Sequence, residues 1–353
     1  MSESAAAHRT RDAASATSAP ARRRGGAATI YDVAELAGVN PSTVSRALSK
    51  PGRISAATEA KIRAAADTLN FRFNPMARAL QTGRSHTLAL VVADITNPVV
   101  FGIVRGAEQA ASAAGYTLVI AESQESGEAE ATAIERLMPS VDGVVMATTR
   151  LSNERIAEIA VRKPVVLINR AVEGIPGVLP DVESGVSELL EHLTALGHRS
   201  IAYVSGPETS WISDKRFELM LEAAGRLGFS LVEIGPNTPT IEGGSAALRR
   251  VLAARPTAVI AFNDLMAIGL MRAAAAQGVR VPEELSVAGF DDIFSSELIT
   301  PSLTTVRAQL VEAGERAVAN LLARLAGEEE DDLQQPLQTT LVVRDSTGAA
   351  STV

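Results

Sequence analysis

Short apolar runs alternate with longer amphipathic stretches along most of the chain after residue 86. Runs of Val, Leu, Ile and Ala with few polar residues are typical of strands that are buried on both faces of a sheet. The strands expected before residue 182 are 87–93, 117–121, 143–147 and 164–168. Apolar positions at helical spacing predict intervening helices around 101–114, 128–138 and 152–161. This order of elements predicts a parallel sheet with helices on both faces.

The same alternation begins again after residue 182. The strands expected in this second series are 200–204, 258–262 and 285–289. The helices expected between them are 184–196, 211–227, 244–254 and 265–277. Two such series predict two α/β lobes, each with a doubly wound parallel sheet. Because ligands of these folds bind at the carboxyl ends of the strands, we expect a cleft between the lobes.

The first ordered segment, residues 29–48, predicts a pair of short helices. Thr29 and Asp32 have the spacing of a capping box, and Gly38 is a typical residue at a helix C-terminus. Asn40 can cap a second helix with Pro41 in its first position. A third helix is expected to begin after a cap at Ser55, with an inner stripe of Ile62, Ala65, Ala66 and Leu69. Two helices joined by a short turn predict an all-α helix-turn-helix unit.

The second of these helices has one apolar and one polar face. Val44, Ala47 and Leu48 are expected to face the core. On the other face, Ser42 and Arg46 can hydrogen-bond base edges in the major groove of DNA, whereas Pro41 offers only apolar contact. Phosphate oxygens suit a second group of side chains, which is Asn40, Thr43 and Ser45. An ordinary helical hairpin without a nucleic-acid partner is the alternative.

Charge is distributed unevenly along the chain, whose formal net charge is −8. Residues 1–86 contain 13 Lys and Arg against 6 Asp and Glu, whereas the rest contains 20 basic and 35 acidic residues. A basic segment attached to an acidic body favours a polyanionic partner for that segment alone. The alternative is a solubilising tail, because Arg22, Arg23 and Arg24 lie in residues 1–28, which are expected to be disordered.

Residues 74–80, with the sequence NPMARAL, predict a short hinge helix. Asn74 is a good N-cap and Pro75 a good first residue. A helix of about two turns is shorter than the ~12–15 residues that an isolated helix needs to persist in water. We therefore expect it to be ordered only when something packs against it. A frayed linker is the alternative.

Several polar residues come directly after predicted strands or near the start of the following helix. They are Asp94, Asn97, Arg170, Arg216, Asn263, Asp264, Asp291 and Asp292. Any one of them could be a cap or turn residue. Together, carboxylates, amides and guanidinium groups at one cleft suit a polyhydroxylated ligand, because each buried hydroxyl needs donor and acceptor partners.

Composition excludes several functional classes. The 353 residues suffice for two or three domains, and the absence of cysteine excludes disulfide frameworks, thiolate metal sites and cysteine nucleophiles. The chain has no sequence typical of a nucleotide-binding loop or a hydrolase, and its four histidines have no ligand spacing. We expect neither an enzyme nor a bound metal or cofactor. With no apolar run near the ~20 residues of a membrane span and no signal-peptide pattern, the expected location is the cytoplasm.

The sequence resembles the LacI/GalR family of bacterial transcription regulators over nearly all of residues 29–346. The blocks that carry the resemblance are DVAELAGV, STVSRAL, LxxLGHRSIAYVSGP, FND, GFDD and PSLTTVR. The family fold implies a helix-turn-helix at 29–73, a hinge at 74–86 and two lobes like those of periplasmic sugar-binding proteins. With three crossings between lobes, the first would comprise 87–182 and 308–327, and the second 183–307 and 334–346. The helix 309–327 would then return to the first lobe, and the strand 337–343 would complete the second.

The resemblance also implies roles for individual residues. The positions implied to contact DNA are Thr29, Tyr31, Asn40, Pro41, Ser42, Thr43, Ser45, Arg46, Asn74, Ala77 and Leu80, the last as a wedge in the minor groove. The positions implied to contact the ligand are Asp94, Phe101, Arg170, Trp211, Arg216, Asn263 and Asp291, with Phe101 and Trp211 as stacking candidates.

The expected function is therefore that of a dimeric transcription regulator, most simply a repressor. It would bind double-stranded operator DNA under the allosteric control of a sugar or similar small molecule. The sequence shows no C-terminal leucine heptad, so we expect a dimer rather than a tethered tetramer. A sugar-binding transport protein would explain the two lobes, but it would require an export signal and no basic helical unit. An enzyme that uses the same lobes lacks a nucleophile or metal constellation.

Overall fold

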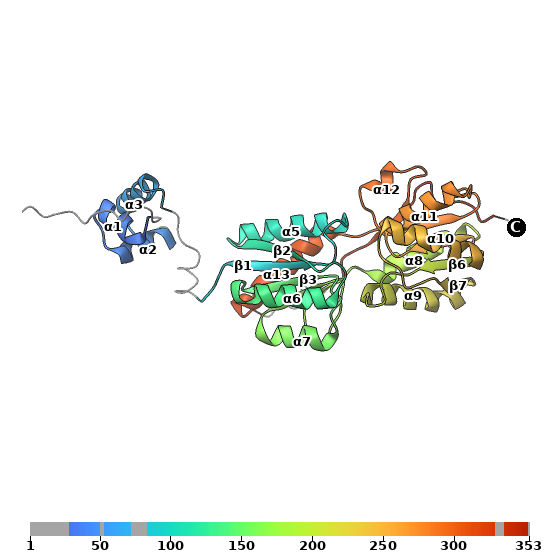
Figure 1. Cartoon of the computed structure of the whole chain (residues 1–353), viewed down its shortest axis with the longest axis horizontal. Coiled ribbons are helices and arrows are strands. Elements are labelled where there is room, and N and C mark those ends of the chain that lie inside the picture. Colours follow the sequence, from blue (N-terminus) through green and yellow to red (C-terminus); the bar gives the residue numbers. More distant parts are fainter. Residues whose placement is uncertain (1–27, 50–52, 72–82, 329–334, 352–353) are drawn as a thin grey trace, which may run out of the picture. The chain divides into compact units, whose positions relative to one another are not determined.

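The computed structural model describes residues 28–49, 53–71, 83–328 and 335–351. The chain divides into two compact units, Met1–Arg78 and Ala79–Val353 (Figure 1). Residues 1–27 of the tail expected to be disordered lie outside the described residues, as does the predicted hinge helix with Asn74, Ala77 and Leu80. Within the described residues, no helix combines the length and the apolar character needed to cross a membrane.

The N-terminal unit contains the three predicted helices, α1 (Ile30–Ala37), α2 (Pro41–Ser49) and α3 (Ala56–Thr68). Thr29 and Asp32 form the predicted capping box, and Gly38 ends α1 in a left-handed conformation with φ +66°. Ser55 caps α3 by accepting a hydrogen bond from the main-chain nitrogen of Thr58. The helices enclose a small core of Val33, Ala34, Val44, Ala47, Ile62, Ala65 and Ala66.

The first lobe of the second unit is built on a five-stranded parallel sheet in the order β2-β1-β3-β4-β5. The strands are β1 (Thr87–Val92), β2 (Thr117–Glu122), β3 (Gly143–Ala147), β4 (Val165–Ile168) and β5 (Gly177–Val178). The helices that follow them are α5 (Val99–Ala113), α6 (Gly127–Leu137, continued by a 3₁₀ turn at Met138–Ser140) and α7 (Asn153–Arg162). Alternate strand residues pack against opposite layers, since Leu88 and Leu90 lie with α5 while Ala89 and Val91 lie with α6.

The second lobe contains a six-stranded sheet in the order β11-β10-β9-β8-β6-β7. Its strands are β6 (Ser200–Val204), β7 (Ser230–Glu233), β8 (Ala258–Ala261), β9 (Ser286–Asp291), β10 (Thr304–Arg307) and β11 (Thr340–Val342). Its helices are α8 (Val182–Ala195), α9 (Trp211–Leu227), α10 (Ile241–Ala254), α11 (Asp264–Ala276) and α12 (Ser295–Leu298). The cores on the two faces of the sheet are distinct: Tyr203 and Ile260 pack with α8 and α9, whereas Val204 and Val259 pack with α10 and α11.

The last long helix, α13 (Leu310–Ala326), returns to the first lobe and packs against α5 and the sheet, as predicted. Glycines permit the close approach of the two helices. A Cβ on Gly106 would collide with the carbonyl of Val311, and one on Gly314 would collide with the carbonyl of Ile103. The backbones therefore touch directly along this helix pair.

The chain then returns to the second lobe beside its first crossing. Leu337 donates its main-chain N–H to the carbonyl of Leu179 at 2.8 Å, and Asp181 donates to the carbonyl of Leu337 at 2.7 Å. The hydroxyl of Thr339 adds a hydrogen bond to the carbonyl of Asp181 at 2.9 Å. Two of the three connections between the lobes are thus held together as a pair.

The structure differs from the predicted elements in five places. β5, β7, β10 and α12 are not among the predicted elements. β5 has two residues, and β7 is an edge strand with mostly exposed side chains, so neither leaves a hydrophobic signal. The predicted strand 337–343 completes the second sheet as the shorter β11. It pairs antiparallel with β10, so this sheet is not wholly parallel.

Candidate functional site

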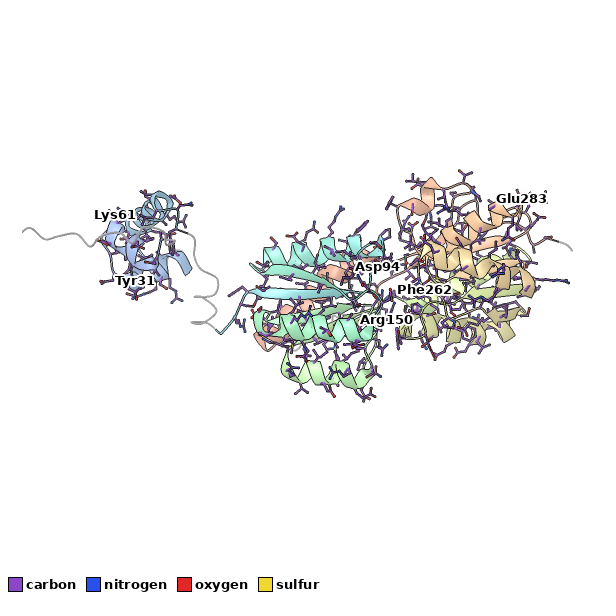
Figure 2. The ribbon with its side chains drawn as sticks, in the orientation of Figure 1. Tyr31, Lys61, Asp94, Arg150, Phe262 and Glu283 are labelled. Carbon is purple, nitrogen blue, oxygen red and sulfur yellow. The ribbon has the colours of Figure 1, made fainter. Side chains whose placement is uncertain are left out.

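Two regions gather the candidate functional residues, and the first is the surface of α2. Val44 and Ala47 are buried, whereas Ser42 and Arg46 are exposed, which is the division of faces that the spacing predicts. Arg46 Nε donates to the carbonyl of Ser42 at 3.3 Å. Asn40 and Thr29 are also exposed, and Pro41, Thr43 and Ser45 are half-buried. Tyr31 on α1 is 70% exposed, and its side chain points away from the unit (Figure 2).

The second region is an inner chamber of about 50 Å³ between the two lobes. It lies at the carboxyl ends of strands from both sheets, where Asp94 and Arg150 of the first lobe face the side that carries Phe262 (Figure 2). The polar side chains that line it are Asp94, Asn97, Glu125, Thr148, Arg150, Asn169, Arg216, Asn263 and Asp291. Four of the seven residues predicted to contact the ligand are therefore brought together here, namely Asp94, Arg216, Asn263 and Asp291.

Arg216, on α9, lines the second-lobe side of the chamber, and two contacts hold its guanidinium group in place. Its guanidinium carbon lies 3.8 Å from the centre of the Phe290 ring, and Nη1 donates to the carbonyl of Phe262 at 2.7 Å. The residue is 8% exposed, and burial lowers the pKa of its guanidinium group, against the opposing effect of Asp291. Nε is buried without a hydrogen-bond partner among the described residues. A ligand oxygen would satisfy this donor, because a buried unpaired N–H is costly.

Asp291 ends β9 with φ +110°, a backbone conformation that residues other than glycine rarely adopt. Burial raises the pKa of its carboxyl to about 8, and the charge of Arg216 opposes that rise. A carboxyl with this pKa can donate or accept a hydrogen bond near neutral pH. The Arg216 and Asp291 pair therefore offers both kinds of partner to a hydroxyl group.

Asn263 and Asp264 follow β8 and have different roles. Asn263 caps α11 through its Oδ1, which accepts from the main-chain nitrogen of Met266 at 2.9 Å. Asp264 is fully buried and accepts hydrogen bonds from Thr305 and Ser296, each at 2.6 Å. Burial raises its pKa to about 7. Asp264 does not line the chamber, so the expectation that it faces the cleft is wrong. Its carboxyl instead ties α11 to the neighbouring strand and loop.

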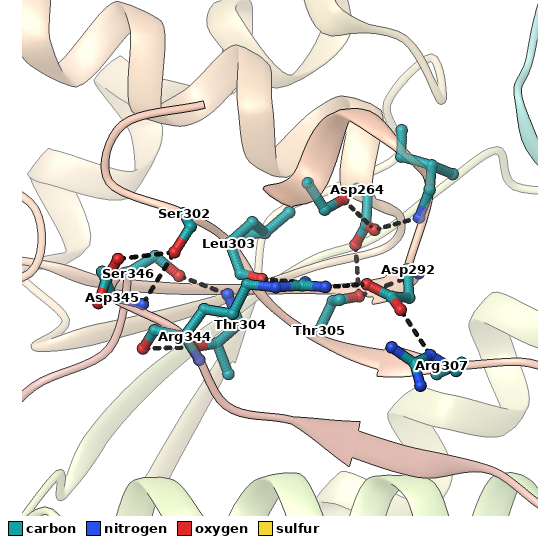
Figure 3. Close-up of polar contacts among 12 residues, drawn as sticks. Asp264, Asp292, Ser302, Leu303, Thr304, Thr305, Arg307, Arg344, Asp345 and Ser346 are labelled. Carbon is teal, nitrogen blue, oxygen red and sulfur yellow. Dashed lines mark hydrogen bonds and ion pairs between the residues drawn. The ribbon is translucent and has the colours of Figure 1, made fainter. Parts of the chain in front are cut away.

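Asp292 also turns away from the chamber, into a network at the edge of the second lobe (Figure 3). Its carboxylate pairs with Arg307 Nε at 2.6 Å and with Arg344 Nη2 at 2.7 Å. Arg344 also donates to the carbonyl of Leu303 at 2.8 Å. These contacts hold the end of β9, and with it Asp291, against β10 and the C-terminal segment.

The first-lobe wall depends on residues that the sequence prediction missed. Arg150 is almost fully buried and pairs with Glu125 at 2.6 Å between Nε and Oε2. Its main-chain nitrogen donates to Glu130, whose pKa is raised by burial. Glu125, Thr148 and Asn169 all have positive φ, as does Asp291 across the chamber. Backbone strain of this kind concentrates at functional sites, and it marks this wall in the structure.

A larger groove of about 790 Å³ opens beside the inner chamber and shares Asp94, Glu125 and Pro239 with it. First-lobe residues 94–96, 122, 124 and 125 form one side, and second-lobe residues 207 and 236–240 form the other. We call it the outer groove.

Three predicted ligand contacts are not in the chamber wall. Phe101 is 55% exposed on α5, and Trp211 packs partly buried against the hydrophobic core. Arg170 Nη2 donates to Asn153 Oδ1 at 2.8 Å and to the carbonyl of Leu151 at 3.3 Å. Its guanidinium group therefore braces the start of α7. The described residues contain no group of three or more His, Cys, Asp or Glu side chains arranged to hold a metal ion.

These features define a protein with a helix-turn-helix unit and a two-lobed α/β unit that has a polar interlobe chamber. A family model for bacterial regulatory proteins of the lacI family matches residues 29–74, and a model for a periplasmic binding protein-like domain matches residues 190–347. The resemblance and the fold class predicted from the sequence are thereby confirmed.

Full-length relatives agree with these models. The HTH-type transcriptional repressor CytR of Escherichia coli K12 is 32% identical over 337 residues, which cover 93% of this chain and 99% of that protein. The ribose operon repressor of Halalkalibacterium halodurans is 31% identical over 323 residues, covering 90% and 97%. A solved structure of the lac repressor dimer bound to operator and the anti-inducer ONPF superposes with a TM-score of 0.82 at 28% identity, covering 92% of this chain and all of that one. The chain belongs to the lacI family.

Proposed function

We propose that this protein is a sequence-specific DNA-binding repressor whose affinity for its operator is controlled by a small polyhydroxylated ligand. The observation that carries the proposal is the exposed polar face of α2, with Ser42 and Arg46 free to reach a double helix. Relatives that span nearly the whole chain are named as transcriptional repressors. Their names support transcriptional repression rather than catalysis or transport.

In this proposal, α2 enters the major groove and reads bases with Ser42 and Arg46. An arginine fork matches the two acceptors of guanine, and the serine hydroxyl can donate or accept. Asn40, Thr43 and Ser45 are assigned to phosphate oxygens, which position the helix. The remaining proposed DNA contacts are Thr29, Tyr31, Pro41, Asn74, Ala77 and Leu80.

The ligand is assigned to the inner chamber and held there by Arg216, Asp291, Asn263 and Asp94. Closing the lobes around it would rearrange the paired connections at Leu179 and Leu337. A ligand shifts such an equilibrium only by its different affinity for the two states. Whether it releases or promotes DNA binding depends on which state the operator favours.

The protein is proposed to act as a homodimer, as the lac repressor does in its complex with operator. A dimer can engage two half-sites one helical turn apart. Exposed apolar side chains on and beside the helices of the second unit, including Phe101, Phe294 and Leu298, provide surface that such an interface would bury.

The test is selection of duplexes from a randomised library by the full-length protein, followed by affinity measurements at several salt concentrations. We expect a pseudo-palindromic consensus and an affinity that falls steeply with salt, because phosphate contacts release counterions. Failure to enrich any sequence would contradict the proposal. A screen of sugars, polyols and nucleosides by thermal shift then identifies the ligand, which at 100 times its Kd stabilises the fold by about 2.7 kcal/mol.

A further inference from the structure

We infer that the ligand has two parts: a hydroxyl-bearing sugar head in the inner chamber, and a second, unphosphorylated group joined to it that occupies the outer groove. A free sugar or a sugar phosphate would fit this site less well. The inference rests on the proposed function and specifies the chemical class of its ligand.

The two spaces differ greatly in volume. Pockets that enclose a small-molecule ligand have volumes of about 300–1,000 Å³. The inner chamber, at about 50 Å³, is far below this range, whereas the outer groove, at about 790 Å³, is within it. The two spaces share Asp94, Glu125 and Pro239, so one molecule can extend through both. The chamber therefore anchors only part of the ligand, and the rest lies in the groove.

The side chains of the chamber select a hydroxyl-bearing head. Arg216 lines the chamber, and its Nε is a buried donor without a partner among the described residues. The Asp291 carboxyl and the Asn263 amide line the same space and supply further donor and acceptor groups. Neighbouring hydroxyls of a sugar both donate and accept, so they can satisfy this set together.

The outer groove has a different chemistry, which favours a flat or apolar second group. Pro207, Pro236 and Pro239 line its second-lobe side, and Ile95, 44% exposed, lines the first-lobe side. Contact between these surfaces and an aromatic or aliphatic group would favour binding, because burial of apolar area contributes roughly 25 cal/mol per Å² to the binding free energy.

Charge in the groove argues against a phosphate. Its lining contains the carboxylates Asp94, Glu122 and Glu125, of which Glu125 is paired with Arg150 of the inner chamber, and no lysine or arginine. Glu122 accepts a hydrogen bond from the main-chain nitrogen of Ile95 at 2.9 Å, so its carboxylate is fixed beside the apolar wall. An anion there would meet like charges at short range, whereas a neutral or cationic group would not.

Calorimetry with the full-length protein tests the inference, using adenosine and phenyl β-D-glucoside as two-part probes against ribose, glucose and ribose 5-phosphate. We expect at least one two-part probe to bind about tenfold or more tightly than its parent sugar, a gain of about 1.4 kcal/mol, and ribose 5-phosphate to bind more weakly than ribose. Preference for adenosine identifies a nucleoside, and preference for the glucoside identifies an aryl glycoside; both support the inference.

Variants assign the effect to the two spaces. Ile95→Ala should weaken the two-part probe more than the parent sugar, and Asp291→Asn should weaken both. Glu122→Gln, which keeps an acceptor for Ile95, should reduce the discrimination against ribose 5-phosphate. Val161→Ala, at a surface position 89% exposed and outside both spaces, is the matched control.

Equal or tighter binding of the free sugar, tighter binding of the phosphate, or no binding of either two-part probe would overturn the inference. None of these results affects the selection of DNA duplexes by the unliganded protein. The proposed function fails instead if no duplex is enriched, so the two failures are distinguishable.

Discussion

Asp142 accepts two hydrogen bonds from Ser85, one from its main-chain nitrogen at 2.7 Å and one from its Oγ at 2.9 Å. The main-chain nitrogen of His86 donates a third at 2.9 Å. Ser85 and His86 immediately precede β1 and follow the segment that connects the two units. A carboxylate just before β3 therefore holds the point at which the connecting segment enters the first lobe.

Replacing this carboxylate should loosen that entry point. We expect Asp142→Ala to lower the free energy of unfolding of the second unit by about 1–3 kcal/mol, because three donors lose a charged acceptor. The single tryptophan, Trp211, lies in this unit, so urea unfolding followed by its fluorescence measures the change. Glu158→Ala, in an exposed surface pair, should change it by less than about 0.5 kcal/mol. An equal effect of the two substitutions would show that the Asp142 contacts contribute nothing specific.

Arg46→Ala should weaken binding to the selected operator by about 1–3 kcal/mol and relax base preference at one position, because it removes the proposed fork to guanine. Fluorescence anisotropy with operator and single-base variants measures both effects. Lys61→Ala removes a cation from α3 and serves as the matched control, with base preference unchanged. Unaltered preference in Arg46→Ala would place base reading elsewhere on the unit.

Arg216→Lys should reduce affinity for the best-binding sugar of the thermal-shift screen by about tenfold or more, since lysine lacks the planar fork and the Nε donor. Isothermal titration provides the measurement. Arg170→Lys is the control, because Arg170 bonds to Leu151 and Asn153 outside the chamber. A larger loss in the Arg170 variant would contradict the assignment of the chamber.

The buried carboxyl of Asp264 predicts a pH dependence of stability. Its pKa in the folded protein is about 7, raised by burial and by the nearby charge of Asp292 from an ordinary value of 3.8. Between about pH 4 and about pH 7, the folded state therefore holds a proton that the unfolded state has released. Stability from this group is present at low pH and declines as pH rises through that window.

Asp264→Asn should remove this contribution. Urea unfolding at several pH values should show that the difference in unfolding free energy, wild type minus variant, decreases from about pH 4 to about pH 7. His192 and His198, whose pKa values are lowered by burial, are present in both proteins and cancel in the difference. A difference that stays level across this window would mean that Asp264 is ionised throughout it.

Two alanine substitutions in helices should have opposite effects. Gly106→Ala should destabilise the second unit by about 1–3 kcal/mol, because its methyl group would strike the Val311 carbonyl. Gly225→Ala, in α9, meets open space and should stabilise by about 0.4–1 kcal/mol through reduced backbone entropy in the unfolded chain. Thermal unfolding of both variants compares them directly. Similar effects at the two positions would indicate that α13 does not pack tightly on α5.

Sequence pattern predicted elements with a strong hydrophobic period and missed those with a weak one. β1 after Thr87 and β3 contain only apolar residues and glycine, and the pattern predicts both within one residue. The predicted strands omit β10, which begins with two buried threonines. Thr304 and Thr305 are buried because Ser346, Arg344 and Asp264 satisfy their polar groups. Partners so distant in sequence leave no local signal.

The candidate site also contains some residues that the sequence pattern predicts and others that it does not. Asp94, Asn263 and Asp291 could be predicted because each ends or follows a strand with a clear pattern. Arg150 could not, since its position in the chamber depends on Glu125, which belongs to a different loop. An aromatic ring suggests stacking on a sugar for Phe101 and Trp211. The orientation of the helices instead directs Phe101 to the surface and packs Trp211 against the core.

The return of α13 to the first lobe has a consequence for synthesis of the protein. One layer of that lobe contains Ala317, Val318 and Leu321, which arrive from the ribosome long after the strands they cover. The nascent first lobe therefore exposes an incomplete apolar face while the second lobe is being translated. We therefore expect chaperones to bind the first lobe during translation. A chain that terminates before residue 310 should lack α13 and leave this lobe incompletely folded.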